Sequence, residues 1–287
     1  MGKQFFVLLR PKHWIKNVFV LAPLIFSFQF LVFSLSFRTF AIVISFSLAA
    51  SSVYIINDIF DIERDRNHPE KKNRPIASGR VPIRSAVFLI VILIINSLCI
   101  AFLISIYALL ILSIYIVINF LYSSWLKHLT LIDVFVIAIG FVLRVISGAV
   151  AANVAVSEWI ILVTFFLSLF LGFSKRYNEI SYNKHQEHRE VLGSYSQEML
   201  LIFMIMSSVL TIVIYTFYTI DPVTLERFNS QKLLYSVPIV VFGVLRYFQL
   251  VVHENLGGDV ADVITKDFYI IATVILWLME IIWSYRW

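Results

Sequence analysis

The feature that most constrains the fold is a long uncharged run from Ser85 to Leu126. As one helix, a run of roughly 40 residues would rise about 60 Å, which is twice the hydrocarbon thickness of a bilayer. The run is too long for a single transmembrane helix and therefore predicts two.

Other apolar stretches are also long enough to cross a bilayer. With 60% hydrophobic and 14% charged residues, the chain has too little polar surface to cover a water-soluble globule. We expect an all-α integral membrane protein with about nine transmembrane helices in one domain, residues 1–287, and no nucleic-acid partner. The further stretches run from Val18 to Phe37, Phe40 to Ile56, Leu131 to Ala152, Trp159 to Ser174, Met199 to Tyr218, Leu233 to Val252 and Phe268 to Ile282.

Basic residues are distributed unevenly between the two ends of the expected helices. If the N-terminus is cytoplasmic, most of the 23 Lys and Arg residues fall in cytoplasmic segments, as the positive-inside bias favours. Nearly all the acidic residues lie on the same side, which indicates a polar working face. We expect a multi-pass protein of the plasma (inner) membrane, with a cytoplasmic active site and with residues 1–17 as an interfacial segment. The basic residues expected on the opposite side are Arg38, Arg227, Lys232 and Arg286.

The densest charged stretch is "NDIFDIERDRNHPEKKNRPIASG", from Asn57 to Gly79. If the preceding helix continues, its phase places Asn57, Asp58, Asp61 and Asp65 on one face. Magnesium prefers hard oxygen ligands and is commonly held by one or two carboxylates together with substrate phosphates. These four residues are therefore the predicted Mg²⁺ ligands, with Asp58 and Asp61 also predicted to be catalytic.

Basic residues follow the acidic ones in an expected cytoplasmic loop, residues 58–84. Arginine suits bidentate contact with phosphate, so the loop carries both halves of a metal-diphosphate site. The alternative is a solvated loop that only obeys the positive-inside rule, and the single-face acidic spacing favours the site. The basic residues are Arg66, Lys71, Lys72, Arg74 and Arg80.

The segment "NDIFDIERD" resembles the first aspartate-rich motif, N-D-x-x-D-x-x-x-D, of the UbiA superfamily of intramembrane prenyltransferases. The following "DRNHPEKKNRPIASG" fits the same family. The resemblance covers essentially the whole chain. It implies nine helices in a ring around a central cavity open to the lipid, with Mg-diphosphate bound at the cytoplasmic end.

Most members of that superfamily carry a second motif, D-x-x-x-D, at the end of the sixth span. The corresponding segment here, "SKRYNEISYNKHQEHRE", lacks it and has Lys175, Arg176 and Glu179 instead. An ordinary surface pair between Lys175 and Glu179 is one interpretation. The other is a receptor for a phosphate group.

Three more segments resemble the branch of the family that transfers phosphoribosyl groups to polyprenyl phosphates: "LRPKHWIKNVFVLAPL", "YSSWLKH" and "IDVFVIAIGFVLRVISGA". The resemblance implies Mg-dependent transfer from 5-phosphoribosyl 1-diphosphate to a polyprenyl phosphate. For Lys12 and Lys16, snorkelling to lipid headgroups is the alternative. The substrate-binding residues then expected are Lys12, Lys16, Asn17, Arg66, Arg74, Tyr122, Lys127, Lys175, Arg176 and Glu179.

The fifth expected span carries a polar and small-residue stripe that includes Asp133, Gly140, Arg144 and Gly148. We expect this stripe to line the cavity. A charged residue near mid-span usually faces the bundle interior and pairs there, so Arg144 is a candidate catalytic contact of the acceptor phosphate. A structural ion pair with a neighbouring helix is the alternative.

Two other functions remain open from the sequence. One is prenyl transfer from a prenyl diphosphate to an aromatic acceptor in quinone or haem synthesis, against which the cationic sixth-span end argues. The other is cation transport, which predicts mid-bilayer ionisable groups and often repeat symmetry. His185 and His188 with Glu187 are a weak metal signal, and "HENLGGDVADVITKD" is a possible cover for the active-site mouth.

Overall fold

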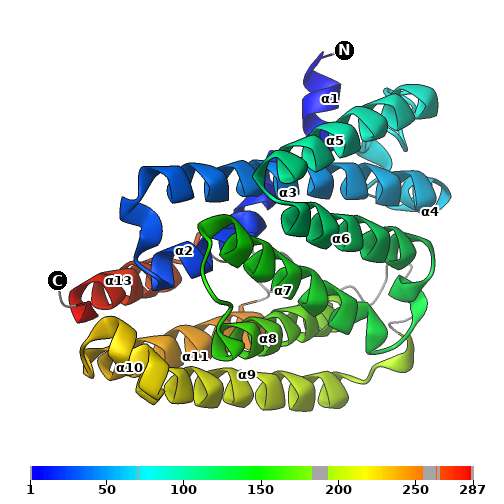
Figure 1. Ribbon diagram of the computed structural model, residues 1–287. Helices are drawn as coiled ribbons and strands as arrows, with labels where there is room; N and C mark the ends of the chain where they lie inside the picture. Colours follow the sequence, from blue (N-terminus) through cyan, green and yellow to red (C-terminus); the bar gives the residue numbers. More distant parts are fainter. Residues whose placement is uncertain (1, 70, 183–192, 255–262, 264–265, 286–287) are drawn as a thin grey trace. The chain divides into compact units, whose positions relative to one another are not determined.

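The computed structural model describes the chain except residues 1, 70, 183–192, 255–262, 264–265 and 286–287. The described residues form helices and no strand, which confirms the all-α prediction (Figure 1). The chain divides into two compact units, residues 1–155 and 156–287, each described here by itself. The single membrane domain stays a prediction.

The first unit contains the two helices predicted within the uncharged run. They are separated at Ser105, whose backbone is extended and whose hydroxyl accepts a hydrogen bond from the Tyr107 amide at the start of the second helix. The elements are α1 (Gly2–Leu9), η1 (Pro11–Leu21), α2 (Ala22–Phe26), η2 (Gln29–Leu31), α3 (Phe33–Phe60), α4 (Ile62–Asn67), η3 (Lys71–Asn73), α5 (Ile83–Ile104), α6 (Ile106–Ser124), η4 (Leu126–His128) and α7 (Ile132–Ala152).

The stretch from Val18 to Phe37 does not form the single span that was expected. Its first part belongs to the 3-10 helix η1, and α2 ends at Phe26. Phe28 then adopts a left-handed backbone with φ 56°, which an L-residue rarely takes inside a helix. The chain therefore turns at Phe28, and the first long helix is α3.

α3 is the centre of the first unit, where it packs against η1, α5, α6 and α7. Alanine and serine on α3 allow this close packing, as is common between membrane helices. One buried cluster joins α3 to these elements through Val20, Phe46, Ala49, Ala101, Leu112 and Tyr115. A second, comprising Leu8, Ile55, Ile76, Val81 and Ile90, lies toward the end of α3 that carries the acidic motif.

In the second unit α8 packs against α9 and α11, and α11 packs against α13. A buried polar contact joins α9 to α13 and η6: the Tyr215 hydroxyl accepts from Trp277 Nε1 at 2.8 Å and lies 2.7 Å from the Ser236 hydroxyl. The elements are α8 (Glu158–Tyr182), α9 (Gln197–Ile220), α10 (Pro222–Phe228), η6 (Lys232–Ser236), α11 (Val237–His253) and α13 (Phe268–Ser284).

Seven helical segments among the described residues are long and apolar enough to cross a membrane, and α13 is a shorter apolar helix of 17 residues. The predicted count of nine is therefore not confirmed. One of the two missing spans lies at the N-terminus, where η1, α2 and η2 replace it, and the other is the shorter α13.

Candidate active site

The acidic motif lies at the end of α3 and the start of α4. Asp61 stands between the two helices, yet its amide donates to Asn57 O at 2.9 Å and its carbonyl accepts from the Asp65 amide at 2.8 Å. The hydrogen-bond pattern of the helix thus continues through the junction. As a result, the segment predicted as a loop from residue 58 begins as helix.

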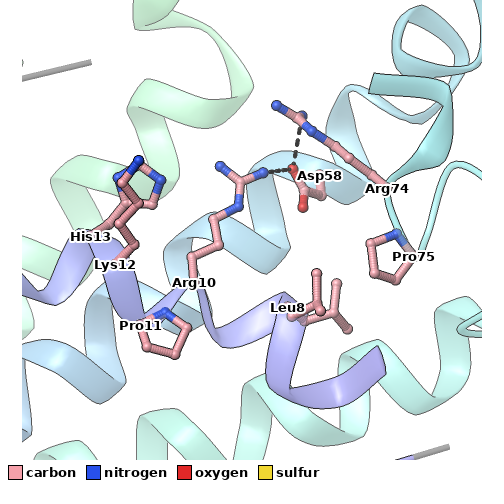
Figure 2. A pocket seen from close by; sticks show the side chains of 9 residues that line it. Leu8, Arg10, Pro11, Lys12, His13, Asp58, Arg74 and Pro75 are labelled. Carbon is pink, nitrogen blue, oxygen red and sulfur yellow. Dashed lines mark hydrogen bonds and ion pairs between the residues drawn. The ribbon is translucent and has the colours of Figure 1, made fainter. Parts of the chain in front are cut away.

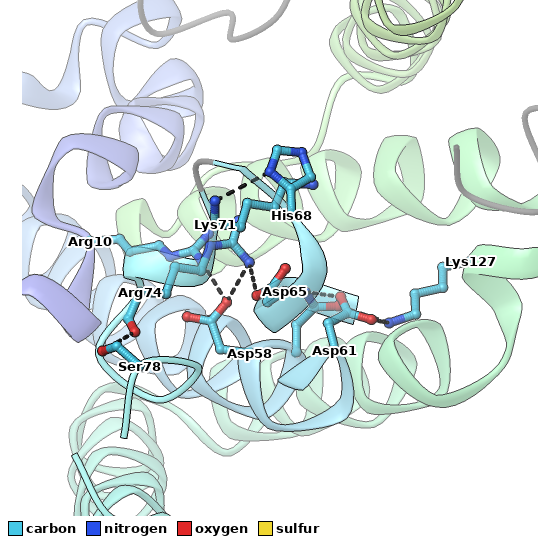
Figure 3. Close-up of polar contacts among 10 residues, drawn as sticks. Arg10, Asp58, Asp61, Asp65, His68, Lys71, Arg74, Ser78 and Lys127 are labelled. Atoms are coloured by element: carbon cyan, nitrogen blue, oxygen red, sulfur yellow. Dashed lines mark hydrogen bonds and ion pairs between the residues drawn. The ribbon is translucent and has the colours of Figure 1, made fainter. Parts of the chain in front are cut away.

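Two buried carboxylates of the motif share one guanidinium (Figure 3). Arg74 Nη1 donates to Asp58 Oδ1 at 3.0 Å and to Asp65 Oδ2 at 2.6 Å. Asp58 and Asp65 are each only 3% exposed, and buried carboxylates need such charge-assisted partners. Arg74 therefore closes the loop that follows α4 back onto the acidic face.

Asp61 has a different cation. Lys127 Nζ, from η4, donates to Asp61 Oδ1 at 2.7 Å and to Asn57 Oδ1 at 3.3 Å, while Asn57 Nδ2 donates to Asp61 Oδ2 at 2.9 Å. Lys127 is 3% exposed. The structure thus brings Lys127 to the acidic motif, where its partners are the Asp61 carboxylate and the Asn57 amide oxygen, and its substrate-binding role stays a prediction.

Arg10 was not among the predicted site residues, yet it contacts the motif directly. Its Nη2 donates to Asp58 Oδ1 at 2.6 Å, and its backbone is left-handed with φ 50°. The Ser51 hydroxyl on α3 fixes this turn by donating to Leu9 O at 2.7 Å and accepting from Trp14 Nε1 at 3.0 Å. The signals in the sequence were a basic residue before Pro11 in the interfacial segment and the place of Arg10 in "LRPKHWIKNVFVLAPL".

A pocket of about 380 Å³ opens beside this ion pair, between the α1 to η1 turn and the end of α3 (Figure 2). Four of its residues carry cationic or titratable nitrogen, namely Arg10, Lys12, His13 and Arg74, and Asp58 lies at its edge. The exposed side chain of Lys12 and the partly exposed guanidinium groups give the pocket a cationic lining, which is chemically suited to an anionic group.

Arg66 contacts the loop and not the acidic motif. It is exposed, and its Nε donates to Ala77 O at 3.3 Å. Nearby Arg80 donates to the Ser78 hydroxyl at 2.9 Å, and Gly79 takes the left-handed φ of 74° that the turn requires. These contacts give Arg66 and Arg80 a role in shaping the loop.

Arg144 and Asn17 are buried in hydrogen bonds with protein groups. Arg144 Nε donates to Asn17 Oδ1 at 2.8 Å, and its two other nitrogens donate to Gly140 O and to the Tyr115 hydroxyl. Arg144 is 6% exposed and Asn17 is 0% exposed. Lys16 on η1 and Tyr122 on α6 are half-buried.

The remaining predicted residues belong to the second unit. Lys175 is half-buried on α8, and Arg176, 1% exposed, donates through Nη1 to Glu179 Oε2 at 2.7 Å. Outside the described residues lie His185, Glu187 and His188. Most of the segment "HENLGGDVADVITKD", which was expected to cover the active-site mouth, also lies outside them.

Among the residues that the structure describes, no three His, Cys, Asp or Glu side chains converge closely enough to hold a metal ion by themselves. Asp58 and Asp65 pair with Arg74, and Asp61 pairs with Lys127, so the predicted set of four magnesium ligands stays a prediction.

The sequence profile of the UbiA prenyltransferase family matches residues 18–189, more than half of the chain. The chain belongs to the UbiA prenyltransferase family.

Full-length relatives of this UbiA-family chain have a more specific name. Decaprenyl-phosphate phosphoribosyltransferase of Mycolicibacterium smegmatis is 31% identical over 94% of this chain and 88% of that protein. The protein of the same name from Corynebacterium glutamicum is 31% identical over 96% of this chain and 83% of its own length.

Among solved structures, a UbiA homologue from Archaeoglobus fulgidus bound to GPP and Mg²⁺ matches with a TM-score of 0.72. The match covers 98% of both chains at 18% identity, so the two share the fold. The UbiA-family chain is therefore a multi-pass membrane transferase.

Proposed function

We propose that this protein transfers the 5-phosphoribosyl group from 5-phosphoribosyl 1-diphosphate to a polyprenyl phosphate and releases diphosphate. The observation that carries the proposal is the 31% identity, over nearly the full length, to proteins named decaprenyl-phosphate phosphoribosyltransferase. The cationic Lys175 and Arg176, at the place of a second aspartate motif, support an anionic acceptor. The active site faces the cytoplasm in this proposal.

The acidic motif fits a Mg²⁺ ion held jointly with a diphosphate. Arg10 and Arg74 contact Oδ1 of Asp58, and Arg74 contacts Oδ2 of Asp65, so each carboxylate has a second oxygen outside these ion pairs. Asn57 and Asp61 supply further oxygens on the same helical segment. The metal, when bound, makes diphosphate a better leaving group. The Mg²⁺ in the related A. fulgidus structure supports this assignment.

The basic pocket then recognises the anionic donor. Arg10, Arg74 and Lys12 line it, and Lys16 lies further along η1. Two of these cations pair with Asp58 in this structure, and they could exchange that carboxylate for substrate phosphate when a metal ion balances the charge of Asp58 in their place. The proposed role of these residues is to bind and orient the diphosphate and the 5-phosphate.

In the reaction, the bond between ribose C1 and the diphosphate oxygen breaks, and a bond between C1 and a polyprenyl phosphate oxygen forms. Attack opposite the departing group inverts C1 and gives a β-linked product. The acceptor oxygen is already anionic, so no strong general base is needed. Lys175 and Arg176 are the proposed partners of the acceptor phosphate, for which Arg176 would exchange its ion pair with Glu179.

A transfer assay tests the proposal. Purified protein receives Mg²⁺, 5-phosphoribosyl 1-diphosphate labelled in the ribose, and a polyprenyl phosphate. A parallel mixture contains labelled prenyl diphosphate and an aromatic acid. We expect label in the lipid product only in the first mixture and none after chelation of the metal. Product formed only in the second mixture would replace the proposal with aromatic prenyl transfer.

A further inference from the structure

Arg144 occupies a closed aromatic site in α7. Its guanidinium carbon lies 4.8 Å from the ring centroid of Tyr115, 5.0 Å from Phe141 and 5.8 Å from Phe46. The acceptors of its three hydrogen bonds are neutral: an amide oxygen, a phenol and the backbone carbonyl of Gly140. Three of the five N–H donors of this guanidinium thus have partners within the protein, and each of its three nitrogens donates to one of them.

Asn17 connects Arg144 to a third element. Its Oδ1 accepts from Arg144, and its Nδ2 donates to the Ser47 hydroxyl at 2.9 Å. The side chain of Asn17 is fully buried, with both ends of the amide engaged. It therefore ties η1 to α7 and α3 at one point, and it is inaccessible to a substrate.

A second contact between α7 and η1 lies one helical turn from Arg144, at Gly148. A Cβ added to Gly148 would approach Val20 O to 1.9 Å, well inside any allowed contact. The backbone of η1 therefore rests directly on Gly148. Arg144 and Gly148 are four residues apart, on one face of α7, and hold two positions of η1, Asn17 and Val20.

The contacts of η1 with Arg144 and Gly148 bear on its conformation, because η1 is a 3-10 helix of 11 residues. Runs of 3-10 helix longer than about four residues are uncommon, since their hydrogen-bond geometry is poorer than that of an α-helix. Tertiary contacts must therefore hold η1 in this conformation. The same segment carries Lys12 and Lys16 and begins directly after Arg10.

We propose that Arg144 is a positioning residue, which acts through Asn17 to hold η1 and so places the cations that receive the sugar diphosphate. The proposal rests on the function proposed above in that these cations bind substrate. It replaces the expectation that Arg144 contacts the acceptor phosphate. In this proposal, the polar and small-residue stripe of α7 is the surface on which η1 packs.

Three substitutions in the full-length protein test this role by different routes. Arg144→Met removes the guanidinium, Tyr115→Phe removes one of its acceptors with little change in shape, and Gly148→Ala displaces η1 while Arg144 remains. The matched control is Gly140→Ala, whose added Cβ would lie in ordinary contact, 3.5 Å from Arg144 Nη1. Hydrogen exchange of residues 11–21 and the two substrate KM values are measured for each.

We expect faster exchange in residues 11–21 in all three variants and wild-type exchange in Gly140→Ala. The KM for 5-phosphoribosyl 1-diphosphate should rise roughly two- to tenfold in Tyr115→Phe, the size of effect of one lost hydrogen bond, with the KM for polyprenyl phosphate unchanged. Wild-type exchange in Tyr115→Phe and Gly148→Ala would overturn the proposal. So would a rise in the polyprenyl phosphate KM alone.

The exchange measurement separates this proposal from the proposed function. If the wild-type protein transfers no phosphoribosyl group, the function fails, yet exchange in residues 11–21 still reports whether Arg144 holds η1. If transfer occurs and exchange rises with both KM values unchanged, the function stands and the positioning role fails.

Discussion

Asp58 is the residue on which two distant parts of the first unit converge. Arg10 reaches it from the N-terminal turn and Arg74 from the loop after α4, and both donate to the same oxygen, Oδ1. In this arrangement the protein's own cations balance the charge of the acidic motif. Arrival of a metal and a diphosphate would replace these contacts with equivalent ones, so binding need not leave a charge unpaired.

Replacing Asp58 with Asn should therefore abolish most of the activity while leaving the fold intact. The amide keeps the size of the carboxylate but loses the charge that binds the metal. We expect turnover to fall by roughly two orders of magnitude or more. The measurement is transfer rate at limiting Mg²⁺, with thermal unfolding in detergent as the check on folding. Glu63→Gln, at an exposed acid on α4, is the control. Near wild-type activity of Asp58→Asn would refute the metal assignment.

Lys175 and Arg176 are adjacent but differ in their surroundings. Arg176 is buried and paired with Glu179, whereas Lys175 is half-buried. A charge-assisted phosphate contact contributes about 1.5 to 3 kcal/mol, so Lys175→Ala should raise the KM for polyprenyl phosphate by about one to two orders of magnitude.

The KM for 5-phosphoribosyl 1-diphosphate should change much less in Lys175→Ala. Steady-state kinetics with each substrate varied in turn measure both values, and Arg84→Ala, at an exposed position on α5, is the control. The opposite pattern would assign Lys175 to the donor pocket.

The sequence predicted what depends on local spacing and missed what depends on distant contacts. The shared face of Asn57, Asp58, Asp61 and Asp65 follows from helical phase alone. The partners of that face do not, because Arg10 lies 48 residues before Asp58 and Lys127 lies 66 residues after Asp61. The positive-inside bias predicted on which side of the membrane these two cations lie, but it could not predict which carboxylates they contact.

At the scale of elements, length and hydropathy located the long helices. Both helices of the uncharged run were predicted, and so was α7 to within one residue. The same criteria failed for η1, α2 and η2, because an apolar composition does not reveal the left-handed turn at Phe28. For Arg144, burial was predicted, and its neutral partners on η1 and α6 were not.

The contact between α11 and α13 gives a prediction for the second unit. A Cβ added to Gly243 would approach Thr273 Cγ2 to 2.9 Å. Gly243→Ala should therefore lower stability by about 1 to 3 kcal/mol, as expected for overpacking. Thr273→Ser removes the opposing methyl group and keeps the hydroxyl, which donates to Tyr269 O at 2.7 Å.

Thermal unfolding followed by tryptophan fluorescence compares Gly243→Ala, Thr273→Ser and the double variant. The double variant should recover most of the stability lost in Gly243→Ala. If the two substitutions are simply additive, the steric contact is not the cause of the loss.

For the whole molecule, the distribution of charge predicts which ends of the helices face the cytoplasm. Asn73 in η3 and Asn229 after α10 are both exposed and should lie on opposite sides of the membrane. Single cysteines at these positions are placed in a Cys99→Ser background, because Cys99 is exposed on α5.

An impermeant thiol reagent added outside intact cells should label the cysteine at position 229 and spare the one at 73. After the membrane is permeabilised, both should react. Labelling of position 73 in intact cells, with protection of 229, would reverse the predicted orientation.

The hydrogen bond between Arg144 and Asn17 joins residues 127 positions apart, and this separation sets an order of events during biosynthesis. The N-terminal segment leaves the ribosome first, but Arg144 and Gly148, against which η1 packs, are synthesised much later. At roughly 5 to 20 residues per second, the delay is on the order of ten seconds. A nascent chain that stops before α7 would already contain the acidic motif and the basic residues of η1. It would lack Arg144 and Gly148, the residues that hold η1 in place. If Arg144 positions η1 as proposed, the sugar-diphosphate pocket is complete only after α7 has been translated and inserted.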